Sequence, residues 1–405
     1  MARHSATLAI NEQIQARRAA GESVLHLGFG EAGLPVLPQL AAVLADTAGA
    51  NAYPPVLGEP DARAAAAGYL GRRGLPTDAD QVIFAPGSKA LLFALLAALP
   101  GDVVLPQPSW VSYAAQAALV GKSVIGVPVP PGSGGIPDPA RLSAALATAE
   151  RPGVLVLTLP DNPTGRVASL ELVTEVCRIA REHDLAIISD EIYRDLTTET
   201  VLSPAEIAPE RTVVTGGLSK NLALGGYRIG FARLPGNGPL TGLSDDLVGI
   251  ASEVWSGLAA PMQAVAAYAL AEPPEIVEHV AKSRRLHTAV ARAVHQVFVA
   301  AGAQCPPPQA AFYLYPDFAV LRPKFRTGAE LAENLLTRHG IGVLAGAEFG
   351  DDPAALRFRA ATSLLYGSTA EQRWAALRDA NPVALPWIRA ALDQLRSGLA
   401  ALSAD

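Results

Sequence analysis

The sequence has few of the residues that mark disulfide-stabilised, metal-binding or nucleic-acid-binding proteins. Only two of its 405 residues are cysteines, Cys177 and Cys305, and they lie far apart. We therefore expect neither a disulfide framework nor a metal site. Lys and Arg total 32 against 38 Asp and Glu, a formal net charge of −6. The arginines form isolated doublets and not the basic stripe of a nucleic-acid-binding protein, so no nucleic-acid partner is expected.

Long apolar runs are also missing. Half of the residues are hydrophobic, yet no run reaches the 18 or so residues of a membrane-spanning helix. The first twenty residues lack the apolar core of a signal peptide. We therefore expect no membrane association and, by default, a cytoplasmic location.

Small and apolar residues are abundant: alanine supplies much of the hydrophobic half, and there are 36 Gly and 33 Pro. This composition can fill large cores, which excludes disorder as the main state. The glycines follow no three-residue period, which excludes a collagen-like protein. At about 150 residues per domain the length favours two to three domains. The apolar surplus is also consistent with a buried subunit interface.

From about residue 80 onward, short apolar runs alternate with helical patterns. The helix expected at 170–183 has apolar residues at 172, 173, 176, 179 and 180, which is a helical spacing. Continuously apolar strands between helices are typical of a parallel sheet covered on both faces. The strands are expected at 81–85, 102–105, 123–127, 153–159, 185–189 and 212–215, and the first helices at 89–99 and 113–119.

The pattern changes after Pro261. Helices are expected at 274–302 and 328–339, strands at 341–344 and 356–360, and a helical end at 370–402 that is interrupted at Pro382 and Pro386. The predicted fold is α/β: a large domain with a mostly parallel sheet sandwiched by helices, and a smaller α+β domain built from both chain ends. The predicted boundaries are 1–45 for an N-terminal segment that packs on the small domain, 46–285 for the large domain and 286–405 for the small domain.

Ligands of open parallel sheets bind at the carboxyl ends of the strands, so the residues that follow each strand are the first candidates for a binding site. Gly87, Ser88 and Lys89 follow the strand at 81–85 and open a helix. Free N–H groups and the helix dipole favour an anion at such a place, which predicts a phosphate cradle. On this motif alone, an ordinary capped helix start is the alternative.

The next two strand ends carry an amide and a carboxylate. Asn162 follows the strand at 153–159 and could donate a hydrogen bond to a ligand oxygen; a plain turn is the alternative. Asp190 ends a buried strand, where ionisation is costly without a partner, and Tyr193 follows three residues later. A cationic ring nitrogen would be a suitable partner for Asp190, whereas local capping is the alternative.

The fourth strand end carries a lysine. Lys220 and Arg228 are the only cations in a Gly-rich, apolar tract. A lone lysine usually faces solvent, but desolvation here would lower its pKa and make it a nucleophile toward a carbonyl. The four strand ends together predict a ligand with a phosphate, a carbonyl, a phenolic oxygen and a basic ring nitrogen. Pyridoxal 5′-phosphate (PLP) has all four.

At these residues the chain resembles the fold type I, PLP-dependent class I/II aminotransferases of the aspartate aminotransferase superfamily. Three motifs occur in the family's order and at its separations: Asn162-Pro163-Thr164-Gly165, Asp190-Glu191-Ile192-Tyr193, and the stretch 219–230. The resemblance extends from Gly28 to Arg359. It implies transfer of an amino group from an L-amino acid to a 2-oxo acid through a Lys220 aldimine, a quinonoid and pyridoxamine phosphate.

The resemblance also implies a role for each matched residue. Lys220 would bind the cofactor and then act as general base, Asp190 would keep the ring nitrogen protonated, and Tyr193 with Asn162 would bind the phenolic oxygen. Gly30, Asn162 and Arg359 would bind the substrate. The remaining cofactor residues would be Gly87, Ser88, Lys89, Ser219 and Arg228 at the phosphate, Trp110 stacked on the ring, and Tyr53 reaching the phosphate of a second subunit. A homodimer with shared active sites is therefore expected.

The chain departs from the family pattern at several places. Gly217 stands where many relatives have a second phosphate-binding serine, and Ala32 replaces a common proline. The chain offers no match for the partner-subunit arginine that selects acidic side chains, so aspartate specificity is not predicted. Arg357 precedes Arg359 by two residues, and on a strand both would point to one face; the motif register favours Arg359.

Other functions remain open at this point. The same site chemistry serves PLP-dependent elimination or replacement, and oxidation of amino acids by O₂. A non-enzymatic effector-binding domain would normally carry a basic DNA-binding extension, which the chain lacks. A hydrolase or a dinucleotide-binding enzyme is disfavoured because neither G-x-S-x-G nor G-x-G-x-x-G follows a predicted strand.

Overall fold

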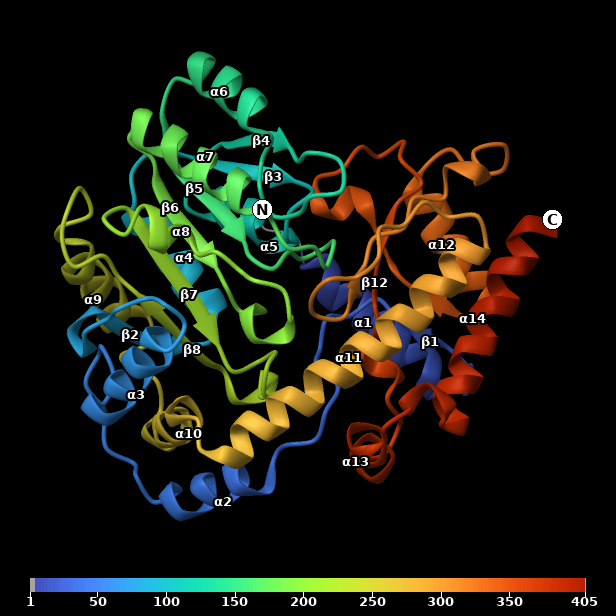
Figure 1. The fold of residues 1–405 in the computed structure, drawn as a ribbon, viewed down its shortest axis with the longest axis horizontal. Coiled ribbons are helices and arrows are strands. Elements are labelled where there is room, and N and C mark those ends of the chain that lie inside the picture. The colour runs from blue at the N-terminus through green and yellow to red at the C-terminus, as the bar shows by residue number, and fades with distance from the viewer. Residues whose placement is uncertain (1–3, 405) are drawn as a thin grey trace.

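The computed structural model describes residues 4–404 and has a larger and a smaller lobe (Figure 1). A seven-stranded sheet forms the centre of the larger lobe, in the order β2-β8-β7-β6-β5-β3-β4. Only β8 runs antiparallel to its neighbours, so the prediction of a mostly parallel sheet is confirmed. The strands are β2 (Val82–Pro86), β3 (Asp102–Gln107), β4 (Val124–Pro128), β5 (Pro152–Thr158), β6 (Ala186–Asp190), β7 (Thr212–Gly217) and β8 (Ile229–Arg233).

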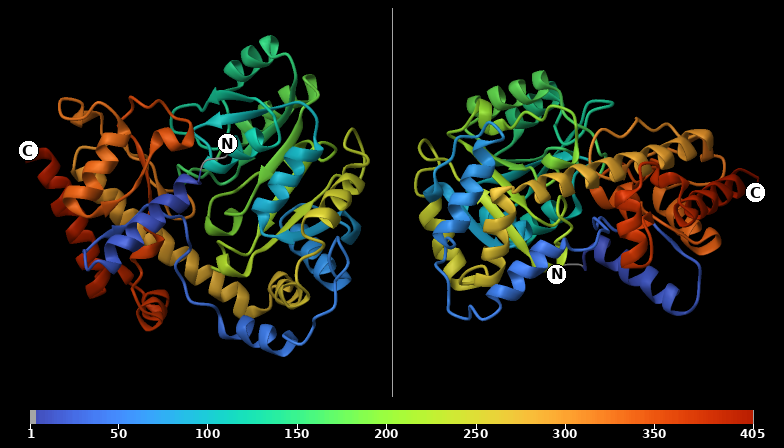
Figure 2. Two further views of the ribbon diagram at one scale, coloured as in Figure 1. Left: turned by 180° about the vertical axis from the view of Figure 1, so that it is seen from behind. Right: turned by 60° about the horizontal axis from the view of Figure 1, so that its bottom comes forward.

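Both faces of this sheet are buried, which explains why its strands are apolar throughout. Side chains alternate between the two faces of a strand. In β5, Val154 and Val156 therefore join a core with α4 (Ser88–Ala98), α5 (Val111–Leu119) and α9 (Leu243–Val254). Leu155 and Leu157 join the opposite core with α6 (Pro139–Thr148) and α7 (Leu170–Glu182). Figure 2 shows these helix layers from two further directions.

The smaller lobe is built from both ends of the chain, as predicted. Its three-stranded sheet has the order β11-β12-β9, and β1 (Leu25–His26) pairs in parallel with β10 (Ile341–Gly342). Ile14 in α1 (Ala6–Ala19) packs with Leu336 in α12 (Gly328–His339). The expected strand at 341–344 is two short strands, β10 and β11 (Leu344–Ala345). The other elements are β9 (Tyr313–Leu314), β12 (Phe358–Ala361), α13 (Ala370–Arg378) and α14 (Pro386–Ala404).

The helix α11 (Pro274–Ala300) joins the two lobes and runs unbroken across the predicted domain boundary at 285/286 (Figure 1). The helix α2 (Pro38–Thr47) contacts α10 (Ala260–Ala271) in the larger lobe. Residues 38–45 therefore pack on the larger lobe, whereas Leu25, Leu27 and Leu34 of the predicted N-terminal segment belong to the core of the smaller lobe. The remaining helices are α3 (Pro60–Gly71), beside α10, and α8 (Pro204–Ile207).

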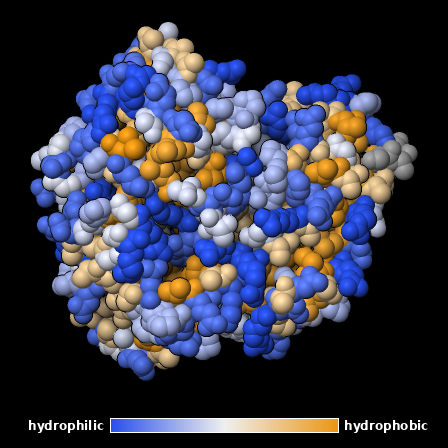
Figure 3. Space-filling model, in the orientation of Figure 1, coloured by the Kyte–Doolittle hydropathy of each residue, from blue (hydrophilic) through white to orange (hydrophobic). Residues whose placement is uncertain are grey.

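The surface is mainly hydrophilic on the face seen in Figure 3, with separate groups of apolar side chains and a hollow between the two lobes. Within residues 4–404, no helix combines the length and the apolar character that crossing a membrane requires.

Candidate active site

A cavity of about 410 Å³ lies where the carboxyl ends of the central strands meet the smaller lobe. It brings together eleven of the thirteen predicted site residues: Gly30, Ser88, Lys89, Trp110, Asn162, Asp190, Tyr193, Ser219, Lys220, Arg228 and Arg359. Gly87 adjoins the cavity through Ser88. Tyr53 lies outside it, and its side chain is 91% exposed.

Lys220 lies in the cavity wall after β7. Its Nζ donates a hydrogen bond to the carbonyl oxygen of Gly30 at 2.5 Å. Burial and, after it, the positive charge of Arg359 lower the pKa of Lys220 to about 8 against the opposing effect of Glu31 and Asp190. A substantial neutral fraction near neutral pH makes this amine both a nucleophile and a base.

Asp190 ends β6 and is 4% exposed. Its carboxylate accepts hydrogen bonds from the Tyr113 hydroxyl at 2.8 Å and the Thr215 hydroxyl at 3.3 Å. Burial raises the pKa of Asp190 to about 6 even though these hydrogen bonds favour the ionised form. No Lys or Arg of residues 4–404 forms an ion pair with it. The carboxylate is therefore suited to a cationic ligand group, such as a protonated ring nitrogen.

Arg359, on β12, is a buried cation with a free donor. Its Nη1 donates to Asn162 Oδ1 at 3.1 Å and its Nη2 to the carbonyl oxygen of Gly28 at 2.8 Å. Its buried Nε has no partner among the described residues. The rings of Tyr313 and Phe349 lie on the guanidinium, with each centroid 5.0 Å from Cζ. The unused donors make Arg359 suited to bidentate binding of a carboxylate.

The start of α4 forms the opposite end of the cavity. Gly87 has φ 90°, and a Cβ there would lie 2.2 Å from Arg228 Nη2. A Cβ on Gly230 would likewise lie 2.2 Å from the amide nitrogen of Ser88. Both glycines are thus required for the close approach of Arg228 and β8 to the helix start. The result is a cradle of N–H groups and positive charge that suits a phosphate.

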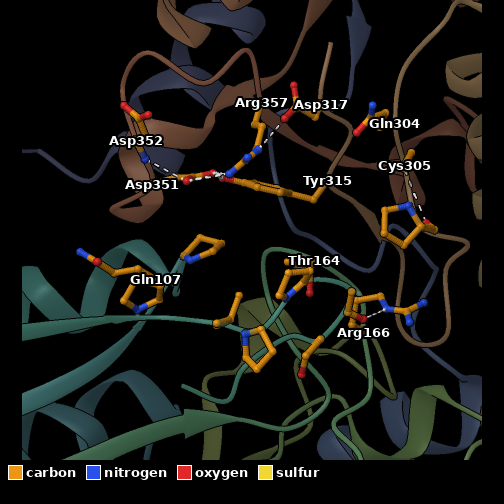
Figure 4. A pocket seen from close by; sticks show the side chains of 18 of the residues that line it. Gln107, Thr164, Arg166, Gln304, Cys305, Tyr315, Asp317, Asp351, Asp352 and Arg357 are labelled. Atoms are coloured by element: carbon orange, nitrogen blue, oxygen red, sulfur yellow. Dashed lines mark hydrogen bonds and ion pairs between the residues drawn. The ribbon is translucent and has the colours of Figure 1, made fainter. Parts of the chain in front are cut away.

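Arg357 does not share the face of Arg359, so that sequence prediction is wrong. It lines a second, larger cavity of about 860 Å³ (Figure 4). There its guanidinium binds Asp317 at 2.9 Å and Asp351 at 3.1 Å. The strand β12 begins only at Phe358, so the two-residue alternation of a strand does not extend back to Arg357.

Sequence reasoning missed several residues of the site, among them the hydroxyl-bearing Tyr113, Thr158, Thr215 and Tyr313. Tyr113 bonds both Asp190 and Thr158 through its hydroxyl, each at 2.8 Å. Thr158 ends β5 and Thr215 lies near the end of β7, so the strand-end rule could have found both. Tyr113 and Tyr313 lie within apolar runs that are typical of a hydrophobic core. No sequence signal distinguishes these two tyrosines from ordinary core residues.

The profile of the family described as "Aminotransferase class I and II" matches residues 22–364. The chain belongs to this family. The aspartate aminotransferase of Geobacillus stearothermophilus is 32% identical over 390 residues, which are 91% of this chain and 95% of that protein. The probable aspartate/prephenate aminotransferase of Thermus aquaticus is 31% identical over 352 residues, or 85% and 89% of the two chains.

A solved structure of the Thermus thermophilus aspartate aminotransferase with maleate superposes with a TM-score of 0.85 at 28% identity, covering 98% of this chain and 97% of that one. The protein is therefore a PLP-dependent aminotransferase that uses amino acids and 2-oxo acids. The predicted family, fold, activity and cofactor are confirmed.

The aminotransferase site fits PLP in three independent ways. The glycine-lined cradle at Ser88 and Arg228 suits the phosphate. The buried Asp190, which has no ion-pair partner in the part of the chain that the structure describes, suits the ring nitrogen. Lys220, with its lowered pKa, lies in the wall of the same cavity and suits the carbonyl.

Proposed function

We propose that this aminotransferase takes its amino group from an acidic L-amino acid and passes it to a 2-oxo acid. The observation that carries the proposal is the match between the charges of the cavity and those of a dicarboxylic substrate with PLP. Arg228 would bind the phosphate and Asp190 would bind the ring nitrogen. Arg359 would bind the α-carboxylate. The Lys89 amine then remains for a second carboxylate.

Lys89 serves two purposes in this proposal. Its amide lies in the first turn of α4, where it would bind the phosphate together with Ser88 and Ser219. Its Nζ lies 5.2 Å from the ring centroid of Trp110, the aromatic expected to stack on the cofactor. Burial and the charge of Arg228 lower the pKa of Lys89, so an added negative charge nearby would be stabilising. The names of the relatives, aspartate and aspartate/prephenate aminotransferases, support an acidic substrate.

PLP, when bound, withdraws electrons from the Cα of the amino acid and so weakens its Cα–H bond. The residues of the chain supply everything else. Lys220 holds the cofactor and, once released from it, would move the proton at Cα as general base. Asp190 would keep the ring nitrogen protonated, and Tyr193 and Asn162 would hold the phenolic oxygen. Arg359 and the backbone at Gly30 would orient the substrate.

We further propose that the enzyme is a homodimer. Tyr53 and Val254 are 91% and 62% exposed, and their segments adjoin, because a Cβ on Gly257 would lie 3.1 Å from the Pro54 ring. Covering these side chains with a second copy would let Tyr53 reach the partner's phosphate site. Light scattering would measure the mass, and a monomer would contradict the proposal. The cytoplasmic location stays a prediction that cell fractionation would test.

The experiment for the function is a half-reaction screen of the PLP-loaded enzyme. Each amino acid is added without an oxo acid, and the absorbance of the cofactor is followed. Aspartate or glutamate should change it at the lowest concentration and yield one 2-oxo acid per site, without ammonia or hydrogen peroxide. Continued release of ammonia or peroxide would indicate elimination or oxidation instead. In Lys89→Ala, the KM for acidic substrates should rise roughly tenfold, and an unchanged KM would exclude Lys89 from substrate binding.

A further inference from the structure

Tyr313 is a buried residue of the cavity to which the sequence assigned no role. In the antiparallel pair of β9 and β12, Tyr313 lies opposite Ala361. Side chains two residues apart on a strand share a face, so Tyr313 and Arg359 point the same way, and the Tyr313 ring centroid lies 5.0 Å from Arg359 Cζ. A Cβ on Gly30 would lie 2.3 Å from the Tyr313 hydroxyl. The hydroxyl is thus held in a narrow space between the glycine and Tyr193.

The hydrogen bonds around Tyr193 can be counted. The Tyr193 hydroxyl lies 3.3 Å from Asn162 Nδ2 and 2.9 Å from the Tyr313 hydroxyl. Arg359 has only donors, so its bond to Asn162 Oδ1 turns the amide N–H group toward Tyr193. A hydroxyl accepts up to two hydrogen bonds and donates one. If Tyr313 also donates to it, both acceptor positions of the Tyr193 oxygen are filled and its own proton is free.

We propose that Tyr313 is a positioning residue that donates a hydrogen bond to Tyr193 and thereby directs the Tyr193 proton to the phenolic oxygen of the cofactor. The chain of donors then runs from Tyr313 to Tyr193 to the ligand, with Asn162 and Arg359 holding it in place. The inference rests on the proposed role of Tyr193 toward that oxygen. It adds a residue that would act on the cofactor oxygen through Tyr193.

The Arg359 cation acts more strongly on the Tyr313 hydroxyl than on the Tyr193 hydroxyl. Burial raises the pKa of both phenols, so both keep their protons near neutral pH. The adjacent Arg359 cation opposes that effect most directly at Tyr313, which makes Tyr313 a good donor. A donor bond onto the Tyr193 oxygen in turn strengthens the bond that Tyr193 donates, because hydrogen bonds in a chain polarise one another.

The test is the pH dependence of the absorbance of the bound cofactor, which requires no substrate. Tyr313→Phe keeps the ring and removes the hydroxyl. A weaker bond from Tyr193 leaves more negative charge on the phenolic oxygen, which then holds the neighbouring proton more tightly. The midpoint of the absorbance change should therefore move to higher pH by roughly half a unit. Tyr315→Phe is the matched control, since its hydroxyl binds Asp351 at 2.8 Å outside this cavity, and its midpoint should stay in place.

A double variant tests whether Tyr313 acts through Tyr193. Tyr193→Phe should shift the midpoint more than Tyr313→Phe, and the double variant should shift no further than Tyr193→Phe alone. Additive shifts would overturn the proposal, as would a wild-type midpoint in Tyr313→Phe, which is the result expected if the residue only fills space.

Failure of this inference can be told from failure of the proposed function. If Tyr193→Phe itself leaves the midpoint unchanged, the proposed role of Tyr193 is wrong; if only Tyr313→Phe does, the proposal for Tyr313 is wrong. Gly30→Ala gives a second route, because the added methyl must displace the Tyr313 hydroxyl. It should shift the midpoint in the same direction, even if Tyr313→Phe fails to fold.

Discussion

The cavities of about 860 and 410 Å³ in this aminotransferase differ in how their charges are matched. The larger, about 860 Å³, has an arginine bound to two carboxylates: Arg357 with Asp317 and Asp351. The smaller, about 410 Å³, holds Lys220, Asp190 and Arg359, which are all without ion-pair partners within residues 4–404. A buried charge without a partner is costly unless a ligand supplies the partner. The unpaired charges, and not the volume, are therefore the reason for choosing the smaller cavity as the candidate active site.

Arg357 and Arg359 show the difference most clearly, because two residues of sequence separate them. Arg357 is half-buried and its donors go to carboxylates of its own lobe. Arg359 is 1% exposed and binds only an amide oxygen and a backbone carbonyl. Burial lowers the pKa of Arg359, whereas burial of Arg357 is outweighed by its carboxylate partners, which raise its pKa.

The largest expected effect is that of Lys220→Ala. Under the proposed role of Lys220, removing the amine would take away both the group that attaches the cofactor and the general base, so turnover should fall roughly a thousandfold or more. Steady-state transamination measures this. Lys282→Ala is the control, because that lysine pairs with Glu278 on the surface, and it should retain wild-type rates. Full activity in Lys220→Ala would contradict the assignment of the smaller cavity.

The second prediction compares the two arginines directly. Arg359→Ala should raise the KM for the amino acid roughly a hundredfold, because a buried carboxylate contact is lost. Arg357→Ala should leave kcat/KM within about threefold and cost about 1 kcal/mol of stability or less, as expected of a half-exposed ion pair. The KM of Arg359→Lys should lie between those of the wild type and Arg359→Ala, since lysine keeps the positive charge but cannot bind a carboxylate through two parallel hydrogen bonds. If the two alanine variants change kcat/KM equally, the smaller cavity can no longer be distinguished from the larger one as the substrate site.

The third prediction concerns pH and Asp190. Its pKa of about 6 in the ligand-free chain means that the carboxylate takes up a proton as the pH falls below that value. It would then no longer favour a protonated ring nitrogen, so cofactor affinity should decrease from pH 7 to pH 5. Asp190→Asn should bind PLP weakly at both values and lose this part of the pH dependence. Fluorescence titrations with PLP at the two pH values would measure the affinity of each protein. If the affinity of both proteins changes equally between pH 7 and pH 5, a group other than Asp190 causes the pH effect.

A smaller effect than those on activity is expected for Asp161, a buried residue next to Asn162. Its Oδ2 accepts from the Thr164 amide and hydroxyl, while its buried Oδ1 has no partner among residues 4–404. Burial raises its pKa to about 7. The folded state therefore binds the proton more tightly than the unfolded chain, and the free energy of unfolding falls as the pH rises from about 4 to about 7.

Asp161→Asn should remove this part of the pH dependence, and the variant should gain roughly 1–3 kcal/mol relative to wild type between pH 5 and pH 7.5. Urea unfolding of both proteins at the two pH values measures the difference. A constant offset between them at both pH values would show that Asp161 stays ionised throughout.

The sequence allowed the central sheet to be predicted because its strands are buried on both faces and so form continuous apolar runs. It did not reveal β8, since the segment that precedes it is rich in glycine and resembled a loop. The helices α2 and α3 were missed for another reason. Both are rich in alanine, so the contrast between apolar and polar positions that reveals a helix is weak.

The candidate site was predictable where residues follow strands. Asn162, Asp190, Ser88 and Lys220 all satisfy the strand-end rule and lie in one cavity. The contribution of the smaller lobe was not predictable in the same way. The position of Tyr313 depends on its pairing with β12, and the separation of Arg357 from Arg359 depends on where that strand begins. The position of Tyr313 and the separation of the two arginines both depend on the pairing register of β9 and β12, which cannot be inferred from the residue types alone.

The most direct test of the account is to find the lysine that carries the cofactor. The PLP-loaded enzyme is reduced with borohydride, digested and analysed by mass spectrometry. Two lysines with lowered pKa line the same cavity, Lys220 and Lys89, so the experiment distinguishes between real alternatives. The account predicts one pyridoxyl group per chain, on Lys220. A pyridoxyl group on Lys89, or none on either lysine, would contradict it.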